Sequence, residues 1–335
     1  MTDFNAAREH VAQVKEEVGR VMVGQDAIVE GVLCGLFTGG HVLLEGLPGL
    51  GKTVLVKTLA AATSLDFSRI QFTPDLMPAD VLGTTVIDED DAGRRSFRFE
   101  EGPIFSNIVL ADEINRATPK TQSAMLEAMQ ERQVTTSGTT RPLPSPFCVL
   151  ATQNPLEMEG TFPLPEAQLD RFAMKLLVPY PSLEELQTIM ERTTGAEVPE
   201  ARSRIDGDAV ETVRACLREM PVIPPVRDAC LRLLLATQPD GDGASEASRA
   251  HVRVGASPRG AQSILAGARF RALLSGRDSV SFGDLRSCVI PCLRHRLVLS
   301  FEAEAAGKTA DDVIEDILET MTDLSAELEE EAVSS

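Results

Sequence analysis

The sequence has no tryptophan, one tyrosine and four histidines, and it lacks any long apolar segment. No run approaches the roughly 20 apolar residues that a membrane-spanning helix needs, so we expect no membrane insertion. The first residues, MTDFNAAREH, lack the basic and then apolar order of a signal peptide, which predicts a cytoplasmic protein. With Tyr180 as the only tyrosine, an aromatic grip on a substrate would depend on phenylalanines such as Phe72 or Phe162.

Basic residues are few as well. The 32 lysines and arginines stand against 51 aspartates and glutamates, which gives a formal net charge of −19. Proteins bind nucleic acid largely by neutralising its phosphates with lysine and arginine. The charge balance therefore argues against a nucleic-acid partner.

The six cysteines form no CxxC motif and have no matching pair of histidines. Cys288 and Cys292 are four residues apart, on one face of a predicted helix, which leaves open a metal site or a redox pair. The simpler interpretation is that all six are small buried side chains in a reducing compartment.

Between about 41 and 181, short β-rich runs alternate with helical patterns such as 119–133. Continuous apolar strands that alternate with helices predict a parallel sheet that is buried on both faces. The predicted strands are 41–45, 67–72, 107–112, 147–152 and 173–178.

The segment 43–53, LLEGLPGLGKT, contains the pattern GxxxxGK[ST] between a predicted strand and a helical pattern, which is the context of a phosphate-binding loop. Its glycines let backbone N–H groups surround phosphate oxygens, and the following helix adds the positive end of its dipole. We expect Lys52 to reach the β- and γ-phosphates and Thr53 to ligate Mg²⁺. The predicted nucleotide-binding residues of the loop are Gly46, Pro48, Gly49, Gly51, Lys52 and Thr53.

Two acidic residues, Asp112 and Glu113, follow the apolar run 108–111. A buried strand that ends in a carboxylate would place Asp112 on Mg²⁺, directly or through another ligand of the metal. Glu113 would then polarise a water aimed at the γ-phosphate. The carboxylate pair therefore favours hydrolysis. Asn154 ends a later strand pattern, FCVLATQN, and is expected near the γ-phosphate and the attacking water.

Strand patterns fade after residue 181, and the second half is mainly helical. Ser182 and Thr309 are predicted to cap helices, whereas 240–251 is predicted to be a flexible loop. We predict three parts, a phosphate-binding-loop domain at 1–181, a helical domain at 182–325 and an acidic tail at 326–335.

Five segments occur in an order and spacing that resemble the MoxR family of AAA+ ATPases. They are the phosphate-binding loop, DEINRA (112–117), ATQNP (151–155), PLPEAQLDRF (163–172) and GASPRG (255–260). The resemblance extends from about residue 4 to 325. It implies a P-loop AAA+ fold, an α/β domain whose parallel five-stranded sheet has helices on both faces, followed by an all-α lid domain.

The resemblance also implies roles for single residues. Asn154 is similar to sensor 1, Arg171 to the arginine finger that enters the neighbouring subunit's site, and Arg259 to sensor 2, which lies over the γ-phosphate of its own subunit. Arg116 belongs to the DEINRA signature and would serve either catalysis or an ion pair at the subunit interface. Further similarities are the adenine-pocket segment Val23, Gly24 and Gln25, the hairpin before sensor 1 at 135–144, and the inserted loop facing the pore at 70–83.

The function implied by the resemblance is an ATPase that converts ATP and water to ADP and phosphate, with ATP and Mg²⁺ bound. Such a protein would assemble as a homo-oligomeric ring, expected to be a hexamer. It would act as a chaperone-like remodeller with a von Willebrand factor A-domain protein, in metal or cofactor insertion or in complex maturation. The alternatives are a DNA-acting or chelatase-type motor subunit, which the acidic charge disfavours, and an ATP-dependent assembly switch without turnover, which Glu113 disfavours.

Overall fold

The computed structural model describes residues 3–89, 95–155, 160–194 and 199–320. The chain divides into two compact units. The first, called the sheet unit, comprises Gln13–Arg171 and Leu176–Glu211, and the second, called the helical unit, comprises Met1–Ala12, Phe172–Lys175 and Thr212–Ser335. The domain boundaries predicted from the sequence stay predictions, and they differ from this division because 182–211 groups with the sheet unit. The predicted acidic tail, 326–335, lies outside the described residues.

The described residues form eleven strands and fourteen α-helices. The strands are β1 (Val42–Glu45), β2 (Phe67–Gln71), β3 (Gly83–Glu89), β4 (Arg95–Glu101), β5 (Ile108–Asp112), β6 (Gln133–Thr136), β7 (Thr139–Pro142), β8 (Cys148–Gln153), β9 (Met174–Leu177), β10 (Val252–Val254) and β11 (Val298–Leu299). The helices are α1 (Phe4–Val21), α2 (Asp26–Thr38), α3 (Lys52–Ala62), α4 (Pro78–Leu82), α5 (Pro119–Glu131), α6 (Glu166–Leu169), α7 (Leu183–Thr194), α8 (Gly207–Glu219), α9 (Pro224–Ala236), α10 (Glu246–His251), α11 (Pro258–Leu274), α12 (Phe282–Leu293), α13 (Phe301–Ala305) and α14 (Ala310–Thr320).

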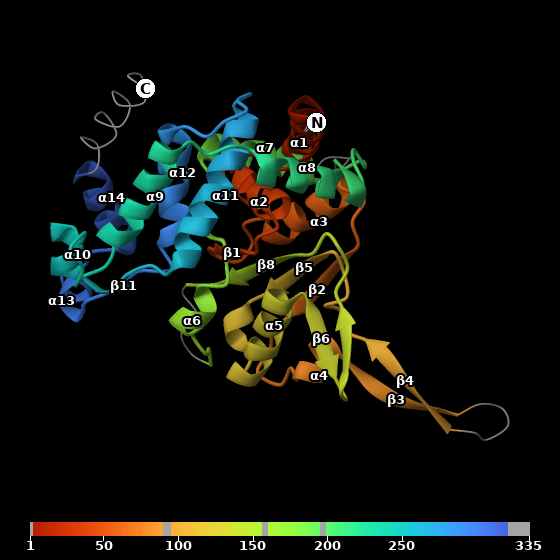
Figure 1. The fold of residues 1–335 in the computed structure, drawn as a ribbon. Coiled ribbons are helices and arrows are strands. Elements are labelled where there is room, and N and C mark those ends of the chain that lie inside the picture. The colour runs from red at the N-terminus through yellow and green to blue at the C-terminus, as the bar shows by residue number, and fades with distance from the viewer. Residues whose placement is uncertain (1–2, 90–94, 156–159, 195–198, 321–335) are drawn as a thin grey trace. The chain divides into compact units, whose positions relative to one another are not determined.

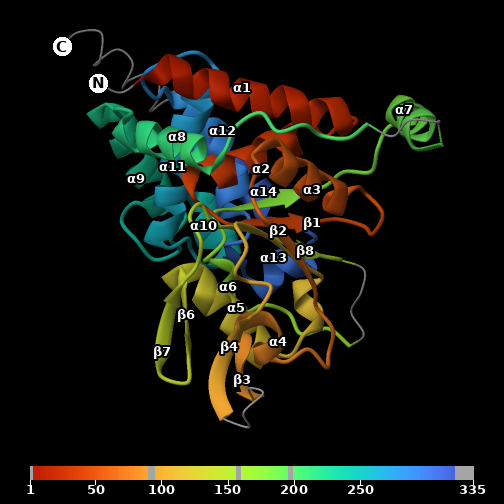
Figure 2. The same cartoon turned by 90° about the vertical axis from the view of Figure 1, so that its right-hand side faces the viewer.

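A five-stranded sheet in the order β2-β5-β8-β1-β9 confirms the predicted fold class. The pairs β2–β5, β5–β8 and β8–β1 are parallel. β1, β5 and β8 are buried up to their last residue, because α2 and α3 cover one face of the sheet and α5 covers the other (Figures 1 and 2). Each predicted strand overlaps an observed one. The carboxyl ends of β2, β5, β8 and β1 therefore meet at one edge, where parallel sheets bind ligands.

Two antiparallel hairpins, β3–β4 and β6–β7, extend from the sheet unit (Figure 2). They touch where the guanidinium of Arg141 lies 3.8 Å from the centre of the Phe99 ring. The segment 70–83, which resembles the inserted loop facing the pore, holds the end of β2 and the helix α4, and its pore-facing role stays a prediction. Phe72 is fully buried and cannot grip a substrate, whereas Phe97 on β4 is 80% exposed.

The helical unit packs α9, α11, α12 and α14 together, with the short antiparallel ladder β10–β11 beside them. Thr309 caps α14 as predicted, since its hydroxyl accepts from Asp312 N–H and its N–H donates to the Asp312 carboxylate. Part of the predicted loop 240–251 is instead the helix α10. Its cap is Ser245, whose hydroxyl accepts from Ser248 N–H at 3.0 Å.

Ser182 likewise caps α7, because its hydroxyl accepts from Glu185 N–H. All six cysteines are buried and form no disulfide, as the simpler interpretation predicted for their structure, and the reducing compartment stays a prediction. Burial raises the pKa of the Cys288 thiol to about 11. Within the described ranges, no cluster of three or more His, Cys, Asp and Glu side chains could hold a metal ion. None of the described helices has the length and apolar character needed to cross a membrane.

Candidate active site

The loop between β1 and α3 turns sharply back on itself at two glycines. Gly49 and Gly51 have φ angles of 81° and 78°, a left-handed conformation that glycine adopts without strain. Gly46 is required for a different reason, because a Cβ there would lie 2.9 Å from the Cβ of Val178. The first N–H groups of α3, which begins at Lys52, have no acceptor within the helix and remain available to an anion.

Lys52 supplies the cation of this loop. Its ammonium group donates to the carbonyl oxygens of Gly46 at 2.5 Å and Leu47 at 3.1 Å, which are part of the loop itself. Burial lowers the pKa of Lys52, and the nearby carboxylates of Asp112 and Glu113 oppose that effect. The lysine is thus held inside the loop by neutral carbonyls, which a phosphate can replace with a stronger charge-assisted hydrogen bond.

A cavity of about 370 Å³ opens between this loop and the ends of β2, β5 and β8. It is lined by Pro48, Gly49, Leu50, Gly51, Lys52, Thr53, Val54, Arg69, Gln71, Asp112, Glu113, Thr152, Gln153 and Asn154. Four segments that are distant in the sequence, one loop and the ends of three strands, therefore meet around one space. Most of the residues predicted for phosphate, metal and water lie here together, and the side chain of Asn154 is nearly buried.

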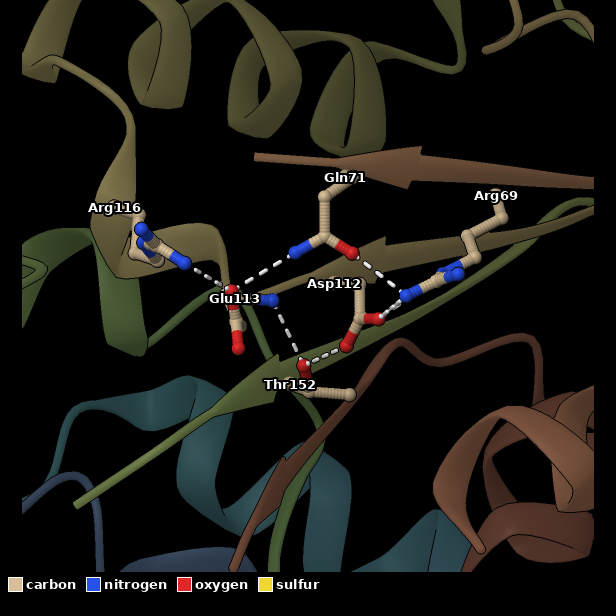
Figure 3. Close-up of polar contacts among 6 residues, drawn as sticks. All are labelled: Arg69, Gln71, Asp112, Glu113, Arg116 and Thr152. Atoms are coloured by element: carbon tan, nitrogen blue, oxygen red, sulfur yellow. Dashed lines mark hydrogen bonds and ion pairs between the residues drawn. The ribbon is translucent and has the colours of Figure 1, made fainter. Parts of the chain in front are cut away.

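Asp112, at the end of β5, is held by groups on both neighbouring strands (Figure 3). One carboxylate oxygen accepts from the Thr152 hydroxyl at 2.6 Å. The other accepts from the Arg69 guanidinium at 2.6 and 3.0 Å. The Asp112 side chain is only 13% exposed, and its charge is balanced here by an arginine of the same chain.

Glu113 has a left-handed backbone with φ of 56°, which turns its side chain away from the strand direction. Its carboxylate accepts from Gln71 at 2.8 Å and from Arg116 at 2.9 Å, and its N–H donates to the Thr152 hydroxyl at 2.8 Å (Figure 3). Arg116 thus forms an ion pair with Glu113 inside its own chain. The two acidic residues are oriented as a unit by β2 and β8.

The residues of the cavity fit a nucleoside triphosphate with Mg²⁺. The glycine loop offers backbone donors, Lys52 offers a cation, and Thr53 with Asp112 offers the hard oxygen ligands that Mg²⁺ prefers. Thr152 and Arg69 already fix the Asp112 carboxylate before any ligand binds. The arrangement can therefore bind triphosphate and orient a water beside it.

The remaining predicted residues lie outside this cavity. Gln25 does approach the loop, since its amide donates to Leu50 O at 3.3 Å, but Val23, Gly24 and Gln25 do not line the cavity. Arg259, on α11, belongs to the helical unit.

Arg171 lines a separate cavity of about 350 Å³ on the α5 and α6 side of the sheet unit. Ser123, Glu127 and Glu131, at four-residue spacing along α5, line the same cavity. The Arg171 Nε atom is buried without a hydrogen-bond partner within the described part of the chain. Arg171 therefore takes no part in the nucleotide cavity of its own chain.

Sequence reasoning did not find Arg69, Gln71 or Thr152. The sequence did contain a signal for the first two, because Arg69 and Gln71 are two residues apart on one strand and therefore lie on the same face of the sheet. Their partners became evident only with the strand order, which places β2 and β8 on either side of β5.

We expect the substitution Arg69→Met to increase the effect of Mg²⁺ on ATP affinity. The Arg69 guanidinium balances the charge of Asp112, so a metal ion must share or displace it. The ATP dissociation constant in EDTA, divided by that in Mg²⁺, should rise roughly twofold to fivefold, as expected for a partly exposed ion pair. Fluorescent ATP titration measures both constants.

The matched control is Arg98→Met, which removes an exposed arginine that pairs with Asp88 on the β3–β4 hairpin. This control should leave the ratio unchanged. An equal loss of affinity with and without Mg²⁺ in Arg69→Met would contradict the prediction, because it would mean that Arg69 binds the nucleotide itself.

Comparison with known proteins agrees with this geometry. The profile of the ATPase family associated with various cellular activities (AAA) matches residues 41–174, and that of the AAA lid domain matches residues 244–317. The chain is 46% identical over 306 residues to chaperone MoxR1 of Mycobacterium tuberculosis. The aligned region covers 91% of this chain and 80% of that protein.

Two further relatives extend over nearly the whole chain. The protein YeaC of Bacillus subtilis is 40% identical over 304 residues, covering 90% of this chain and 91% of YeaC. A solved structure from Cytophaga hutchinsonii, described provisionally as an ATPase, is 41% identical and superposes with a TM-score of 0.88, covering 94% of this chain and 95% of that one.

Proposed function

The chain belongs to the MoxR family of AAA+ ATPases, and from this premise we propose that it hydrolyses ATP to remodel a partner protein. One observation carries the proposal. Two carboxylates, Asp112 and Glu113, are fixed at the edge of a cavity whose other wall is a phosphate-binding loop. A protein that only binds ATP needs the first carboxylate for Mg²⁺, whereas the second is suited to activating water.

We assign the following roles to the cavity. Lys52 and the loop N–H groups neutralise the phosphates, and Thr53 and Asp112 hold Mg²⁺. When bound, Mg²⁺ neutralises charge that develops on the phosphate oxygens. Glu113 accepts the proton of the attacking water, and Asn154 orients that water or the γ-phosphate. Gly46, Pro48, Gly49 and Gly51 shape the loop, and Val23, Gly24 and Gln25 form the adenine side.

We further propose that the site is completed by a second copy of the chain. AAA+ proteins generally assemble as rings. Arg171 lies away from its own nucleotide cavity and would enter that of a neighbour in a hexamer. Arg259 would act over the nucleotide of its own subunit. Each active site would then depend on residues of two chains, so that hydrolysis reports assembly.

The partner in this proposal is a von Willebrand factor A-domain protein, with a role in metal or cofactor insertion or in complex maturation in the cytoplasm. The net charge of −19 does not support a DNA-acting motor. A pull-down from the source organism's lysate in ATP, with Glu113→Gln as bait, should return a protein with that domain. A set of captured proteins without any A-domain would argue against this partner.

The proposed ATPase activity is tested by phosphate release over a range of protein concentrations, with mass photometry of the same samples. We expect Mg²⁺-dependent release whose rate per subunit rises as higher oligomers form. The variant Lys52→Ala, which lacks the loop cation, should show none. If the unsubstituted protein releases no phosphate at any concentration, the proposed activity is wrong. If monomers release phosphate rapidly, the proposal that two subunits share each site is wrong.

A further inference from the structure

Arg296, just beyond α12 in the helical unit, binds the backbone that directly follows Arg171. Its side chain is largely buried, and the residue is 7% exposed. The guanidinium donates to Phe172 O at 2.8 Å and to Ala173 O at 3.2 Å. It also donates to Cys292 O in the last turn of α12. Arg296 thus joins the end of α12 to the two residues that come immediately after the predicted arginine finger.

His295 adds a second donor to the same carbonyl. Its Nε2 lies 3.0 Å from Phe172 O, and because a carbonyl can only accept, Nε2 carries the proton. Burial lowers the pKa of His295 to about 3, with the neighbouring Arg296 as a second cause, so the ring is neutral. The Phe172 carbonyl is therefore fixed by two side chains that come from adjacent positions of one segment.

Arg296 also contacts the N-terminal part of α11. The Nη2 atom that donates to Phe172 O also donates to Ser263 Oγ at 3.3 Å. Gly260 packs so closely that a Cβ there would lie 3.4 Å from Arg296 Cδ and 2.8 Å from Leu293 Cδ2. Gly260 directly follows Arg259, which lies in the first turn of α11. One buried arginine thus contacts both the turn that carries Arg259 and the backbone that continues from Arg171.

We propose that Arg296 is a positioning residue that couples the two proposed arginines of one subunit. The inference rests on the proposed function, in which Arg259 responds to the nucleotide of its own subunit and Arg171 acts on that of the neighbour. A movement of the α11 start would be transmitted through Arg296 to the backbone at Phe172, and so to the adjacent Arg171. The nucleotide bound in one subunit would thereby control the position of Arg171, which enters the active site of the neighbouring subunit.

The contact depends on a guanidinium rather than on charge alone. Arg296 binds neighbouring carbonyls with two nitrogens of a rigid planar fork. A lysine ammonium has one nitrogen and lacks the planar fork, so it cannot reproduce the hydrogen bonds to both carbonyls. Arg296→Gln and Arg296→Lys are therefore both informative, and Lys is the variant to use if Gln prevents folding.

The test uses mixed rings in which only one kind of site can turn over. A donor chain with Glu113→Gln cannot hydrolyse ATP but offers an intact finger, and an acceptor chain with Arg171→Ala has an intact site but no finger. The mixture should hydrolyse ATP where donor and acceptor meet. Arg296→Gln is then placed in the donor alone or in the acceptor alone, and phosphate release and melting temperature are measured.

When Arg296→Gln is in the donor chain, we expect the ATP turnover of the mixture to fall at least tenfold. When Arg296→Gln is in the acceptor chain, turnover should fall less than twofold. Equal losses in both positions, or no loss in either, would overturn the inference. Arg294→Gln is the matched control, since Arg294 pairs with Asp311 within the helical unit, and its effect should be the same in donor and acceptor. If the unmodified donor and acceptor pair shows no turnover, the shared site itself is wrong and the inference ends with it.

Discussion

Glu113→Gln should abolish nearly all ATP turnover while leaving ATP binding intact. Glutamine has the size of glutamate and keeps an oxygen that can accept from Gln71 and Arg116, so the side chain should stay in place. It cannot take a proton from water. Loss of a general base typically costs a factor of about 10²–10⁴, which sets the expected decrease in kcat. The dissociation constant for ATP should change by less than about threefold, because Lys52 and the glycine loop are unaffected.

Single-turnover phosphate release and fluorescent ATP titration separate the two effects. In ATP, the variant should also remain in its assembled form for longer than the intact chain, which gel filtration in ATP would detect. Glu315→Gln is a suitable control, because it makes the same chemical change on an exposed position of α14. Normal turnover by Glu113→Gln would exclude Glu113 as the base. Loss of ATP binding would indicate that Glu113 shapes the cavity.

The three central strands of the sheet, β1, β5 and β8, were predictable because their local sequences show that they are buried. Runs such as VLL in β1 and CVLA in β8 are apolar without alternation, as expected for strands covered on both faces. The β3–β4 hairpin was missed because its strand residues are mostly exposed and six of the 14 are charged, so its pattern resembles a loop. α10 was missed because glycines and aspartates precede it, although Ser245 is a regular helix cap.

The candidate site was predictable only where its residues are contiguous. The phosphate-binding loop and the pair Asp112 and Glu113 each lie in one short segment, and the structure brings them to one cavity. Arg69 and Thr152 act on Asp112 from neighbouring strands, and no local pattern encodes which strands are neighbours. The roles of Arg171 and Arg259 depend on a second subunit or on domain positions, so they remain predictions.

Arg171→Ala should eliminate turnover without weakening ATP binding. Arg171 lines the cavity on α5 and α6, not the nucleotide cavity of its own chain, so its loss cannot act on the bound nucleotide of that chain. Within the described part of the chain, the Arg171 Nε atom has no hydrogen-bond partner. Replacing Arg171 with alanine therefore breaks no hydrogen bond of Nε. The decrease in kcat should be about 10³–10⁵, the usual value of an arginine finger.

Phosphate release and ATP titration are measured at concentrations above and below ring assembly, with melting temperature as a check on folding. Arg95→Ala is the control, because it removes an arginine from an exposed ion pair with Glu89 on the hairpin and should not affect turnover. Addition of the intact chain should restore hydrolysis at sites of the variant, since those sites then receive a finger from a neighbour. If ATP binding falls together with turnover, Arg171 serves its own subunit. If turnover persists, another cation completes the site.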